Sequence, residues 1–326
     1  MLFRSDPRTR AVANLSGDAS LEAAELGRMS SIARVEGRLV DAYVLAVDAL
    51  RLAEQSGDRS TEGCVLQSMG SILLDAGDAA EALATCRRSR EICRDIGDHR
   101  AERAALDTMA RIHRFRGDLE RASLNFEAAL AVGRGDGDDA ADATTMVELA
   151  AVRLLLGDAA HAAELADEAL VLARARVAAV LPSIAPVAAE VIATNGAPDE
   201  ARHLLIEVLD QEPADESVRA GILLALGRID GRVGEPREAA RRFEDALASA
   251  RSVGRLDLEA RVLEARTDVH KALGDAQSAI LDLERRLQLV ESSSAERLAT
   301  RVEMLRLVHD ENESRSRADV LDRLIG

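Results

Sequence analysis

Seven glycines recur along this chain at intervals close to forty residues. They are Gly37, Gly77, Gly117, Gly157, Gly196, Gly234 and Gly274, with successive gaps of 40, 40, 40, 39, 38 and 40 residues. Such a period is typical of proteins built from stacked helix pairs, each of which contacts only its neighbours. The period therefore predicts one elongated array of seven pairs, although 326 residues would suffice for two globular domains.

Two columns of small residues keep the same period. Five residues after each glycine stands an alanine: Ala42, Ala82, Ala122, Ala162, Ala201, Ala239 and Ala279. Seven residues before each glycine stands a small residue: Ser30, Gly70, Ala110, Ala150, Ala189, Gly227 and Thr267. Small facing side chains let two helix axes approach to about 8–10 Å. The columns therefore predict where the two helices of each pair cross.

The glycines and their neighbours also predict where helices end and begin. Glycine adopts the left-handed cap conformation without a Cβ penalty, so each glycine is expected to end the first helix of its pair. Asp78 and Asp158 are N-cap candidates for second helices, and Pro198 and Pro236 fall at first-turn positions where a missing N–H costs nothing.

Three positions depart from the pattern. Pro186 lies four residues after Pro182, which predicts a shortened or kinked first helix in the fifth pair. Arg266 stands where most other pairs carry Met or Leu, so the repeat pattern defines the core of the seventh pair less clearly. Cys86 occupies a position that is Phe or Leu in sister repeats and is interpreted as a core residue.

The segment from Ser68-Met69-Gly70 through Gly77-Asp78, Ala82 and Leu83 to Ile96-Gly97-Asp98 resembles the tetratricopeptide repeat (TPR) in its forty-residue form. That form is known from cell-polarity adaptors with Leu-Gly-Asn repeats and from bacterial signalling proteins. The resemblance implies an all-α, right-handed α-solenoid of about seven helix pairs with a C-terminal capping helix. It divides the chain into an N-terminal extension (1–18), the array (19–291) and a capping or linker helix (292–326).

The last pair is expected to end at Val290, and a separate helix is expected from Ala295 to Gly326. The apolar residues Leu298, Val302 and Leu305 lie at helical spacing in it. This helix resembles the segment that leads from TPR arrays into diguanylate cyclase or histidine kinase domains. It leaves open a homodimer formed through the C-terminal helix.

Composition excludes several classes of partner. A net charge of −16 and an aromatic content of 2% oppose binding to nucleic acid, which requires clustered cations and stacking platforms. The same charge disfavours anionic membranes, and neither a spanning segment nor a signal-peptide core is apparent. Three cysteines without a CxxC pair indicate no zinc site. The expectation is a cytoplasmic protein.

No sequence motif supports catalysis. The chain contains no Gly-rich phosphate loop, no HExxH and no GxSxG, and its six histidines are dispersed. We therefore expect a protein that is not an enzyme and that uses no cofactor and no metal.

The TPR resemblance implies a concave groove lined by the first helices, whose outward polar residues hold a peptide. By register the groove residues are Arg28, Arg34, Gln67, Ser71, Asp107, Arg111, Arg114, Glu148, Glu190, Arg228 and Arg232. Because Arg suits bidentate carboxylate recognition, an acidic or C-terminal carboxylate-bearing segment is the expected ligand. The chaperone-tail carboxylate clamp is missing, since its positions carry residues such as Gln67, Ser71 and Glu148.

Two functions follow from these features. The first is a non-enzymatic binding scaffold or sensor module in bacterial signalling, with a protein or peptide ligand in the groove. The alternative is a regulatory input domain for a diguanylate cyclase, a histidine kinase or a transcription regulator whose output domain is absent from this chain.

Overall fold

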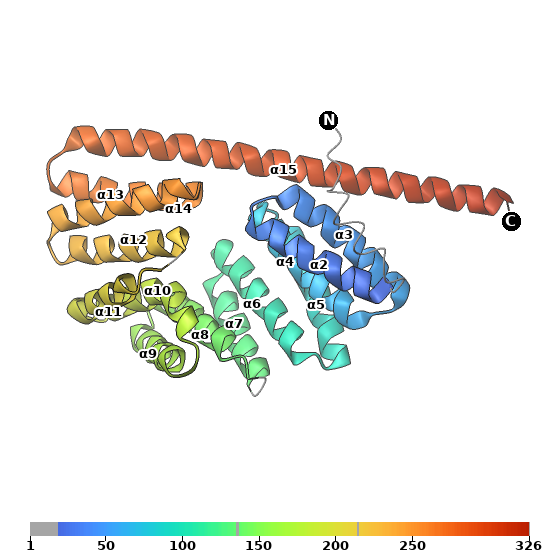
Figure 1. Ribbon diagram of the computed structural model, residues 1–326, viewed down its shortest axis with the longest axis horizontal. Coiled ribbons are helices and arrows are strands. Elements are labelled where there is room, and N and C mark those ends of the chain that lie inside the picture. Colours follow the sequence, from blue (N-terminus) through green and yellow to red (C-terminus); the bar gives the residue numbers. More distant parts are fainter. Residues whose placement is uncertain (1–18, 135–136, 214, 326) are drawn as a thin grey trace. The chain divides into compact units, whose positions relative to one another are not determined.

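The computed structural model describes residues 19–134, 137–213 and 215–325, with side chains described as far as residue 307. Within these ranges the regular structure comprises fourteen α-helices and one short 3-10 helix, without a strand (Figure 1). The helices are arranged as a TPR-like helical-repeat solenoid, which confirms the predicted all-α class. The N-terminal extension predicted over 1–18 lies outside the described residues.

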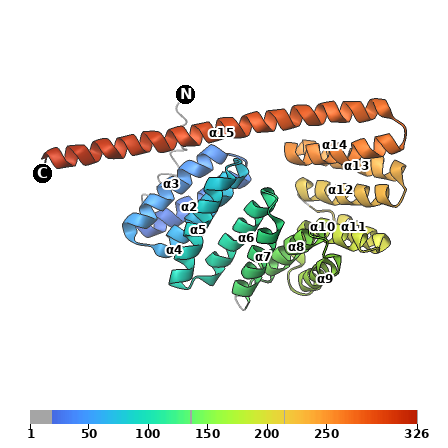
Figure 2. The ribbon, with the colours of Figure 1, turned by 180° about the vertical axis from the view of Figure 1, so that it is seen from behind.

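The chain divides into two units, which Figures 1 and 2 show from opposite sides. Unit 1 comprises Met1–Asp118 with Glu296–Gly326, and unit 2 comprises Leu119–Ala295. Unit 1 contains α2 (Ala19–Val35), α3 (Leu39–Ser56), α4 (Arg59–Asp75), α5 (Ala79–Ile96) and α6 (His99–Phe115). Unit 2 contains α7 (Leu119–Gly133), α8 (Asp139–Leu155), α9 (Ala159–Arg176), η1 (Ala178–Val180), α10 (Leu181–Thr194), α11 (Pro198–Asp210), α12 (Glu216–Arg232), α13 (Pro236–Ser252) and α14 (Leu256–Ala272). The last helix, α15 (Ala276–Ile325), contributes to both units.

Consecutive helices pack against one another within each unit, so every pair buries its apolar face between neighbours. In unit 1, α2 packs on α3, α3 on α4, α4 on α5 and α5 on α6, while the first helices α2, α4 and α6 also contact in sequence. In unit 2, the first helices α8, α10, α12 and α14 follow the same rule. The first helices therefore form a continuous face in each unit.

The seven periodic glycines adopt the predicted left-handed conformation, with φ from 76° at Gly274 to 93° at Gly196. At Gly117 the cap is a Schellman arrangement, because the Gly117 N–H donates to Arg114 O (3.0 Å) and the Asp118 N–H donates to His113 O (2.9 Å). The second helices begin as predicted, since the Asp78 carboxylate accepts from the Glu81 N–H at 3.2 Å.

The columns of small residues lie at the helix crossings. The seven alanines are buried, six of them completely, and the Ser30 hydroxyl donates to the Ala42 carbonyl at 2.7 Å. A Cβ on Gly70 would lie 2.1 Å from the Cys86 sulfur, so this crossing has no room for one. Cys86 itself is fully buried, which confirms its predicted place in the core.

The first helix of the fifth pair is shortened as predicted. Helix α10 has 14 residues, whereas α8 and α12 have 17 each. Pro182 lies in its first turn and Pro186 lies inside the helix, where its ring removes one backbone donor. A single 3-10 turn, η1, precedes the helix and completes the connection from α9.

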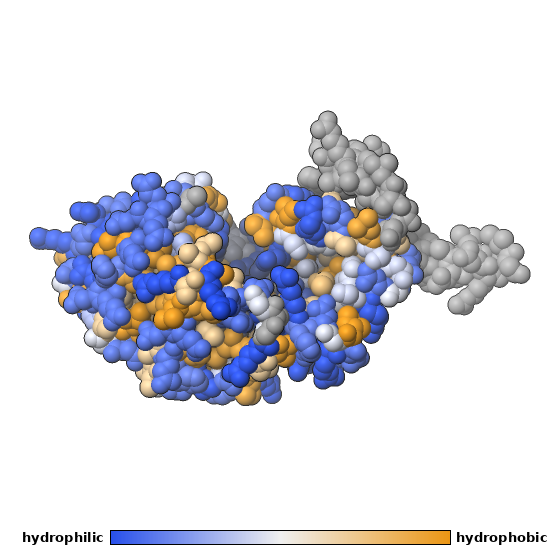
Figure 3. All heavy atoms as spheres, turned by 60° about the horizontal axis from the view of Figure 1, so that its bottom comes forward, coloured by the Kyte–Doolittle hydropathy of each residue, from blue (hydrophilic) through white to orange (hydrophobic). Residues whose placement is uncertain are grey.

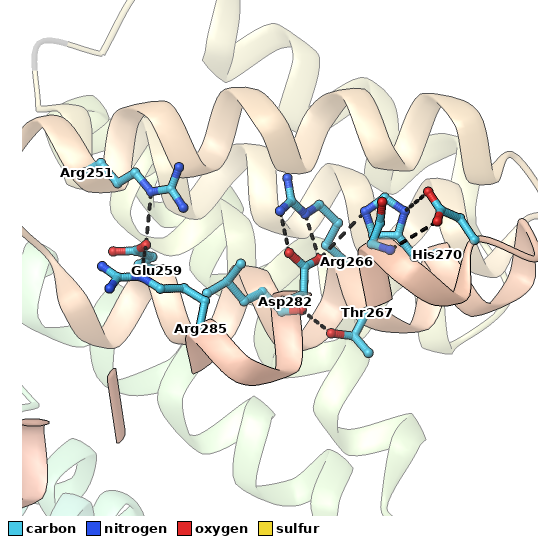
Figure 4. Close-up of polar contacts among 10 residues, drawn as sticks. Arg251, Glu259, Arg266, Thr267, His270, Asp282 and Arg285 are labelled. Atoms are coloured by element: carbon cyan, nitrogen blue, oxygen red, sulfur yellow. Dashed lines mark hydrogen bonds and ion pairs between the residues drawn. The ribbon is translucent and has the colours of Figure 1, made fainter. Parts of the chain in front are cut away.

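The seventh pair adds buried ion pairs to its apolar core, one of them at Arg266, the position that departs from the repeat pattern. Arg266 on α14 donates to both carboxylate oxygens of Asp282 on α15, at 2.5 and 2.9 Å (Figure 4). Asp282 is only 3% exposed, and the His270 ring lies 3.7 Å from it. Nearby, the buried Glu259 accepts hydrogen bonds from Arg251 (3.0 Å) and Arg285 (3.2 Å).

The predicted break between Val290 and Ala295 is wrong, because α15 runs without interruption for 50 residues. The intervening sequence Glu291-Ser292-Ser293-Ser294 contains neither Gly nor Pro. Ser has only a modest helix penalty, so nothing in this segment ends the helix. The seventh second helix and the predicted C-terminal helix are therefore one element.

Candidate functional site

In unit 1, polar side chains link each first helix to the next. Arg34 on α2 forms an ion pair with Asp75 on α4 at 2.8 Å, and the hydroxyls of Ser31 and Ser68 lie 3.4 Å apart between the same helices. Between α4 and α6, the Gln67 amide donates to the Thr108 hydroxyl at 2.8 Å. We call this set the unit 1 ladder: Ser31, Arg34, Gln67, Ser68, Ser71, Asp75 and Thr108.

Two predicted groove residues in the unit 1 ladder, Ser71 and Arg34, are wholly or partly buried. Ser71 is only 6% exposed, and its hydroxyl accepts a hydrogen bond from the Gln67 amide at 3.2 Å. This bond helps to orient the Gln67 side chain. Arg34 keeps 28% of its side chain exposed. Arg28 does not join the ladder, because it is exposed and pairs with Glu25 one turn earlier in the same helix, and this hydrogen bond lowers the pKa of Glu25.

Helix α6 carries the remaining predicted residues of unit 1. Asp107 and Arg114 are partly buried, whereas Arg111 is exposed. Within the described ranges Arg111 forms no hydrogen bond and no ion pair. Its positive charge acts on Cys86, where burial raises the pKa of the thiol to about 12 and Arg111 opposes that rise. Arg111 is therefore a cation with its donors available.

Unit 2 has an equivalent set of contacts, which we call the unit 2 ladder. Glu190 on α10 pairs with Arg228 on α12 at 3.0 Å, and the Arg232 guanidinium donates to the Thr194 hydroxyl at 3.2 Å. Glu148 on α8 is partly buried. The predicted residues thus fall into two groups, one in each unit.

The charges of the unit 2 ladder act on a residue that sequence reasoning missed. Arg261 on α14 has its pKa lowered by desolvation and then by the Arg228 guanidinium, whereas the Glu190 carboxylate acts in the opposite direction. The charges of both members of the Glu190–Arg228 pair therefore act on the Arg261 guanidinium, which as an arginine remains protonated at neutral pH.

Exposed apolar side chains at the ends of the first helices were also missed. Val35 and Phe115, which are 79% and 57% exposed, lie two residues before their glycines in unit 1. Asp75, a member of the unit 1 ladder, holds the same position in α4. The signal was an apolar residue in a column that is polar in three repeats, at Asp75, Thr194 and Arg232. In unit 2 that column contains Leu155, which is 65% exposed.

Figure 3 shows one face of the molecule, on which apolar side chains lie between hydrophilic ones without merging into one large patch. The described residues contain no cluster of three or more His, Cys, Asp or Glu that could hold a metal ion. In the same ranges, no helix is both long and apolar enough to cross a membrane.

Comparison with known families supports the repeat assignment. Residues 61–135, which span most of α4 and all of α5, α6 and α7, match the family model described as Tetratricopeptide repeat. A comparison with curated proteins finds no match by sequence.

Several solved structures share the fold. The apo form of the quorum sensor NprR from B. thuringiensis is 16% identical, with a TM-score of 0.70, and the alignment covers 87% of this chain and 80% of NprR. The Rap conjugation gene regulator of plasmid pLS20, solved in complex with the Phr* peptide, is 13% identical with a TM-score of 0.67 over 90% of this chain and 79% of that chain. A Rap protein complexed with Competence and Sporulation Factor is 14% identical with a TM-score of 0.65, covering 89% and 80% of the two chains.

Proposed function

We propose that this protein is a non-enzymatic regulator of bacterial signalling that binds a peptide, or an extended segment of a partner protein, on the first-helix face of unit 1. The observation that carries the proposal is the unit 1 ladder, with the exposed residues Arg111 and Phe115 about one and two turns beyond Thr108 on α6. The ladder holds its polar groups in fixed positions before any ligand arrives. Preorganised groups bind with a smaller loss of conformational entropy.

The exposed residues Phe115 and Arg111 on α6 add an aromatic surface and a positive charge to the polar groups of the ladder. Phe115 offers an aromatic surface that is 57% exposed in a chain with only four Phe. Aromatic and Arg side chains are the residues most enriched among those that dominate binding energy. Phe115 is suited to anchor an apolar ligand side chain, and Arg111 is suited to pair with a carboxylate.

The solved structures that share the fold support a peptide ligand. Two of the three were determined with a bound Phr* peptide or Competence and Sporulation Factor, and the third is a quorum sensor. A cytoplasmic location agrees with this role, because a signalling peptide would be read inside the cell. The proposal transfers this class of ligand, and not any particular peptide, to the present chain.

The charge of the site selects among peptides. Arg111 has no carboxylate partner in the described residues, so an acidic side chain or a C-terminal carboxylate would complete it. The rest of the chain is acidic, with a net charge of −16, and repels anions at long range. An acidic peptide therefore needs a direct contact with Arg111 in order to bind.

The test uses fluorescein-labelled synthetic heptapeptides, in acidic, neutral and basic pools, each made with a free C-terminus and with an amide. Anisotropy should select acidic or free-carboxylate peptides. Arg111→Glu should weaken binding of the selected peptide at least tenfold, which corresponds to about 1.4 kcal/mol. Phe115→Ala should weaken it by a similar factor.

The matched control is Arg237→Glu, which makes the same charge change at an exposed residue of the second helix α13. It should leave binding within a factor of two, since net charge alone changes equally in both variants. Equal losses in the Arg111 and Arg237 variants, or an Arg111 variant that binds as well as the parent, would contradict the proposal.

A further inference from the structure

Four apolar side chains lie exposed along residues 276–295, the part of α15 that belongs to unit 2. We call them the α15 seam, and their exposed fractions are Ile280 (55%), Leu283 (44%), Leu287 (58%) and Val290 (46%). They follow one another at intervals of three, four and three residues, so they share one side of the helix over about 15 Å. Single exposed apolar residues are ordinary, but a row on one element indicates an interaction surface.

The corresponding positions of the preceding second helices are buried. Leu283 lies nine residues after its glycine, and the residues at that position in the first six repeats are all buried: Ala46, Cys86, Phe126, Ala166, Leu205 and Phe243. In the sixth repeat, Phe243 and Leu247 correspond to the seam residues Leu283 and Leu287. Both share a core cluster with Val262 of α14, the following first helix. These positions therefore belong to the interface between one helix pair and the next.

A different side of α15 is buried within the seventh pair. Ala279, Asp282 and Leu289 are each no more than 4% exposed, and Asp282 forms its ion pair with Arg266 of α14. This part of α15 lies at the end of the row of helices in unit 2 (Figures 1 and 2), and through residue 325 no further first helix follows it. The seam is therefore an interface between pairs of which the described chain supplies one side.

The first repeat treats its outer side differently. Twelve residues before each periodic glycine stands a residue that is buried in the second to seventh repeats: Val65, Ala105, Thr145, Ile184, Ile222 and Val262. In the first repeat this residue is Glu25, which is partly exposed and pairs with Arg28. A polar outer face on a terminal repeat keeps a solenoid soluble. The first repeat has such a charged residue at this position, whereas the α15 seam is entirely apolar.

One residue beside the seam defines the charge of a suitable partner. Seventeen residues after its glycine, the sixth repeat has Arg251, which pairs with Glu259 of the following first helix at 3.0 Å. The corresponding residue of α15 is Glu291, which is exposed and forms no hydrogen bond and no ion pair with the described residues. A helix that packs on the seam as α14 packs on α13 would therefore need a cation at the position of Glu259.

A second copy of this chain does not offer such a helix at the start of its array. Glu22 of α2 stands at the position of Glu259, fifteen residues before its glycine, and would meet Glu291 with like charge. Glu25 of the same helix would lie against the apolar seam and lose part of its solvation. Both features disfavour head-to-tail stacking of copies through α2 and α15.

From these observations we infer that the α15 seam binds an amphipathic helix of a partner protein in the place of an eighth first helix. The partner helix presents apolar residues at the positions that Leu258 and Val262 occupy in α14, and Lys or Arg at the position of Glu259. The occupant is a helix because the seam continues an interface that first helices fill in the preceding repeats. The inference does not depend on the peptide site proposed for α6, since no residue is shared.

The probe is a fluorescein-labelled synthetic peptide with the sequence of α14 (Leu256–Ala272) carrying Glu259→Lys. The unaltered peptide is the charge control, since its apolar residues are identical. Anisotropy with the full chain should show saturable binding of the Glu259→Lys peptide and at least tenfold weaker binding of the unaltered peptide. No saturable binding of the Glu259→Lys peptide, or equal binding of both peptides, would overturn the inference.

Variants of the protein test the place of binding. Leu287→Asp should weaken binding of the Glu259→Lys peptide at least about 30-fold, because it puts a charge into the apolar seam. Leu124→Asp on α7, where Leu124 is 63% exposed, is the matched control and should leave binding unchanged. Glu291→Lys should reverse the preference between the two peptides, whereas Glu244→Lys, at an exposed residue of α13, should preserve it. A Leu287 variant that binds like the parent, or a Glu291 variant with an unchanged preference, would contradict the assignment.

Sedimentation equilibrium of the full chain separates a partner helix from a second copy. The parent and the Leu287→Asp variant should have the same mass at every concentration, because the seam is not a contact between copies. An increase in mass with concentration that Leu287→Asp abolishes would assign the seam to a second copy and overturn the inference.

Discussion

The second and seventh repeats share one backbone plan and fill it with different chemistry. Both place a small residue seven positions before the glycine, Gly70 in one and Thr267 in the other, and both bury it. Beside it, the second repeat has Met69 in an apolar core, whereas the seventh has Arg266 paired with the buried Asp282.

A third position is alike in both repeats. Glu62 and Glu259 lie fifteen residues before their glycines, both are buried, and each accepts a hydrogen bond from an Arg of the second helix. The Glu62–Arg88 distance is 2.7 Å and the Glu259–Arg285 distance is 3.2 Å. The ion pair at Arg266 is thus an addition to a common plan and not a different fold.

This comparison shows that the small residues at the helix crossings determine the backbone arrangement. The position beside the crossing can hold either an apolar side chain or one member of a buried ion pair. The apolar core and the buried ion pair respond differently to mutation. An apolar residue can be altered alone, but one partner of a buried ion pair cannot, because its removal leaves an uncompensated charge in the core.

The largest expected effect comes from breaking the pair in the seventh repeat. Arg266→Met introduces the residue that the second repeat carries and leaves Asp282 buried without its main partner. It should destabilise the chain by about 3–5 kcal/mol. The double variant Arg266→Met/Asp282→Leu should recover that loss, because the charge is removed together with its partner. Urea unfolding followed by circular dichroism gives the free energies.

Hydrogen exchange would localise the loss to α14 and α15, since repeat arrays open locally. Lys271→Met is the matched control, because Lys271 pairs with Asp268 at an exposed site where both side chains are more than half accessible. It should cost no more than about 1 kcal/mol. A single Arg266 variant as stable as the Lys271 variant would refute the role given to the buried pair.

A smaller loss of stability is expected when one carbon atom is added at Gly70 in the second repeat. In Gly70→Ala the new Cβ would lie 2.1 Å from the Cys86 sulfur and 3.3 Å from the Ala82 carbonyl oxygen. Overpacking at this crossing should cost about 1–3 kcal/mol, measured by thermal unfolding. Adding Cys86→Ala should restore part of the loss, because it removes the atom in closest contact.

Gly221→Ala in α12 is the opposite case, since a Cβ there meets nothing within 4 Å. It should stabilise the chain by about 0.5–1 kcal/mol, because alanine is the better helix former. If both glycine variants shifted stability in the same direction, the small column would not mark a close crossing.

The smallest expected effect concerns the pH dependence of the seventh repeat. Burial acts to raise the pKa of Glu259, but the hydrogen bonds from Arg285 and Arg251 outweigh it and hold the pKa below its usual value. A carboxyl with a lowered folded-state pKa contributes stability above its unfolded value of about 4.3, and this contribution is lost as pH falls through the folded pKa.

In Glu259→Gln the melting temperature should therefore fall less steeply than in the parent as the pH is lowered below 5. Glu264→Gln provides the comparison, because Glu264 pairs with Arg286 at a site where it is 51% exposed. That variant should follow the parent curve. Parallel curves for the parent and the Glu259 variant would mean that the pair is not titrating as described.

Much of the architecture could be predicted from the period. The left-handed glycines, the buried alanine column and the place of Cys86 in the core all follow from positions that repeat, and a repeated position has a repeated environment. The continuity of α15 could not be predicted in this way, because Glu291-Ser292-Ser293-Ser294 is neutral between helix and loop. Phe115 was missed for a related reason, since an apolar residue in a periodic chain is assigned to the core by default.

The sequence by itself determined the class of structure, the number of helix pairs and the points where they cross, because glycine conformation and side-chain volume act locally and identically in each repeat. Only the tertiary structure decided which polar residues pair with one another. Gln67 reaches Thr108 and Arg266 reaches Asp282 because neighbouring helices bring them within hydrogen-bonding distance, and that distance depends on packing between elements rather than on spacing along the chain.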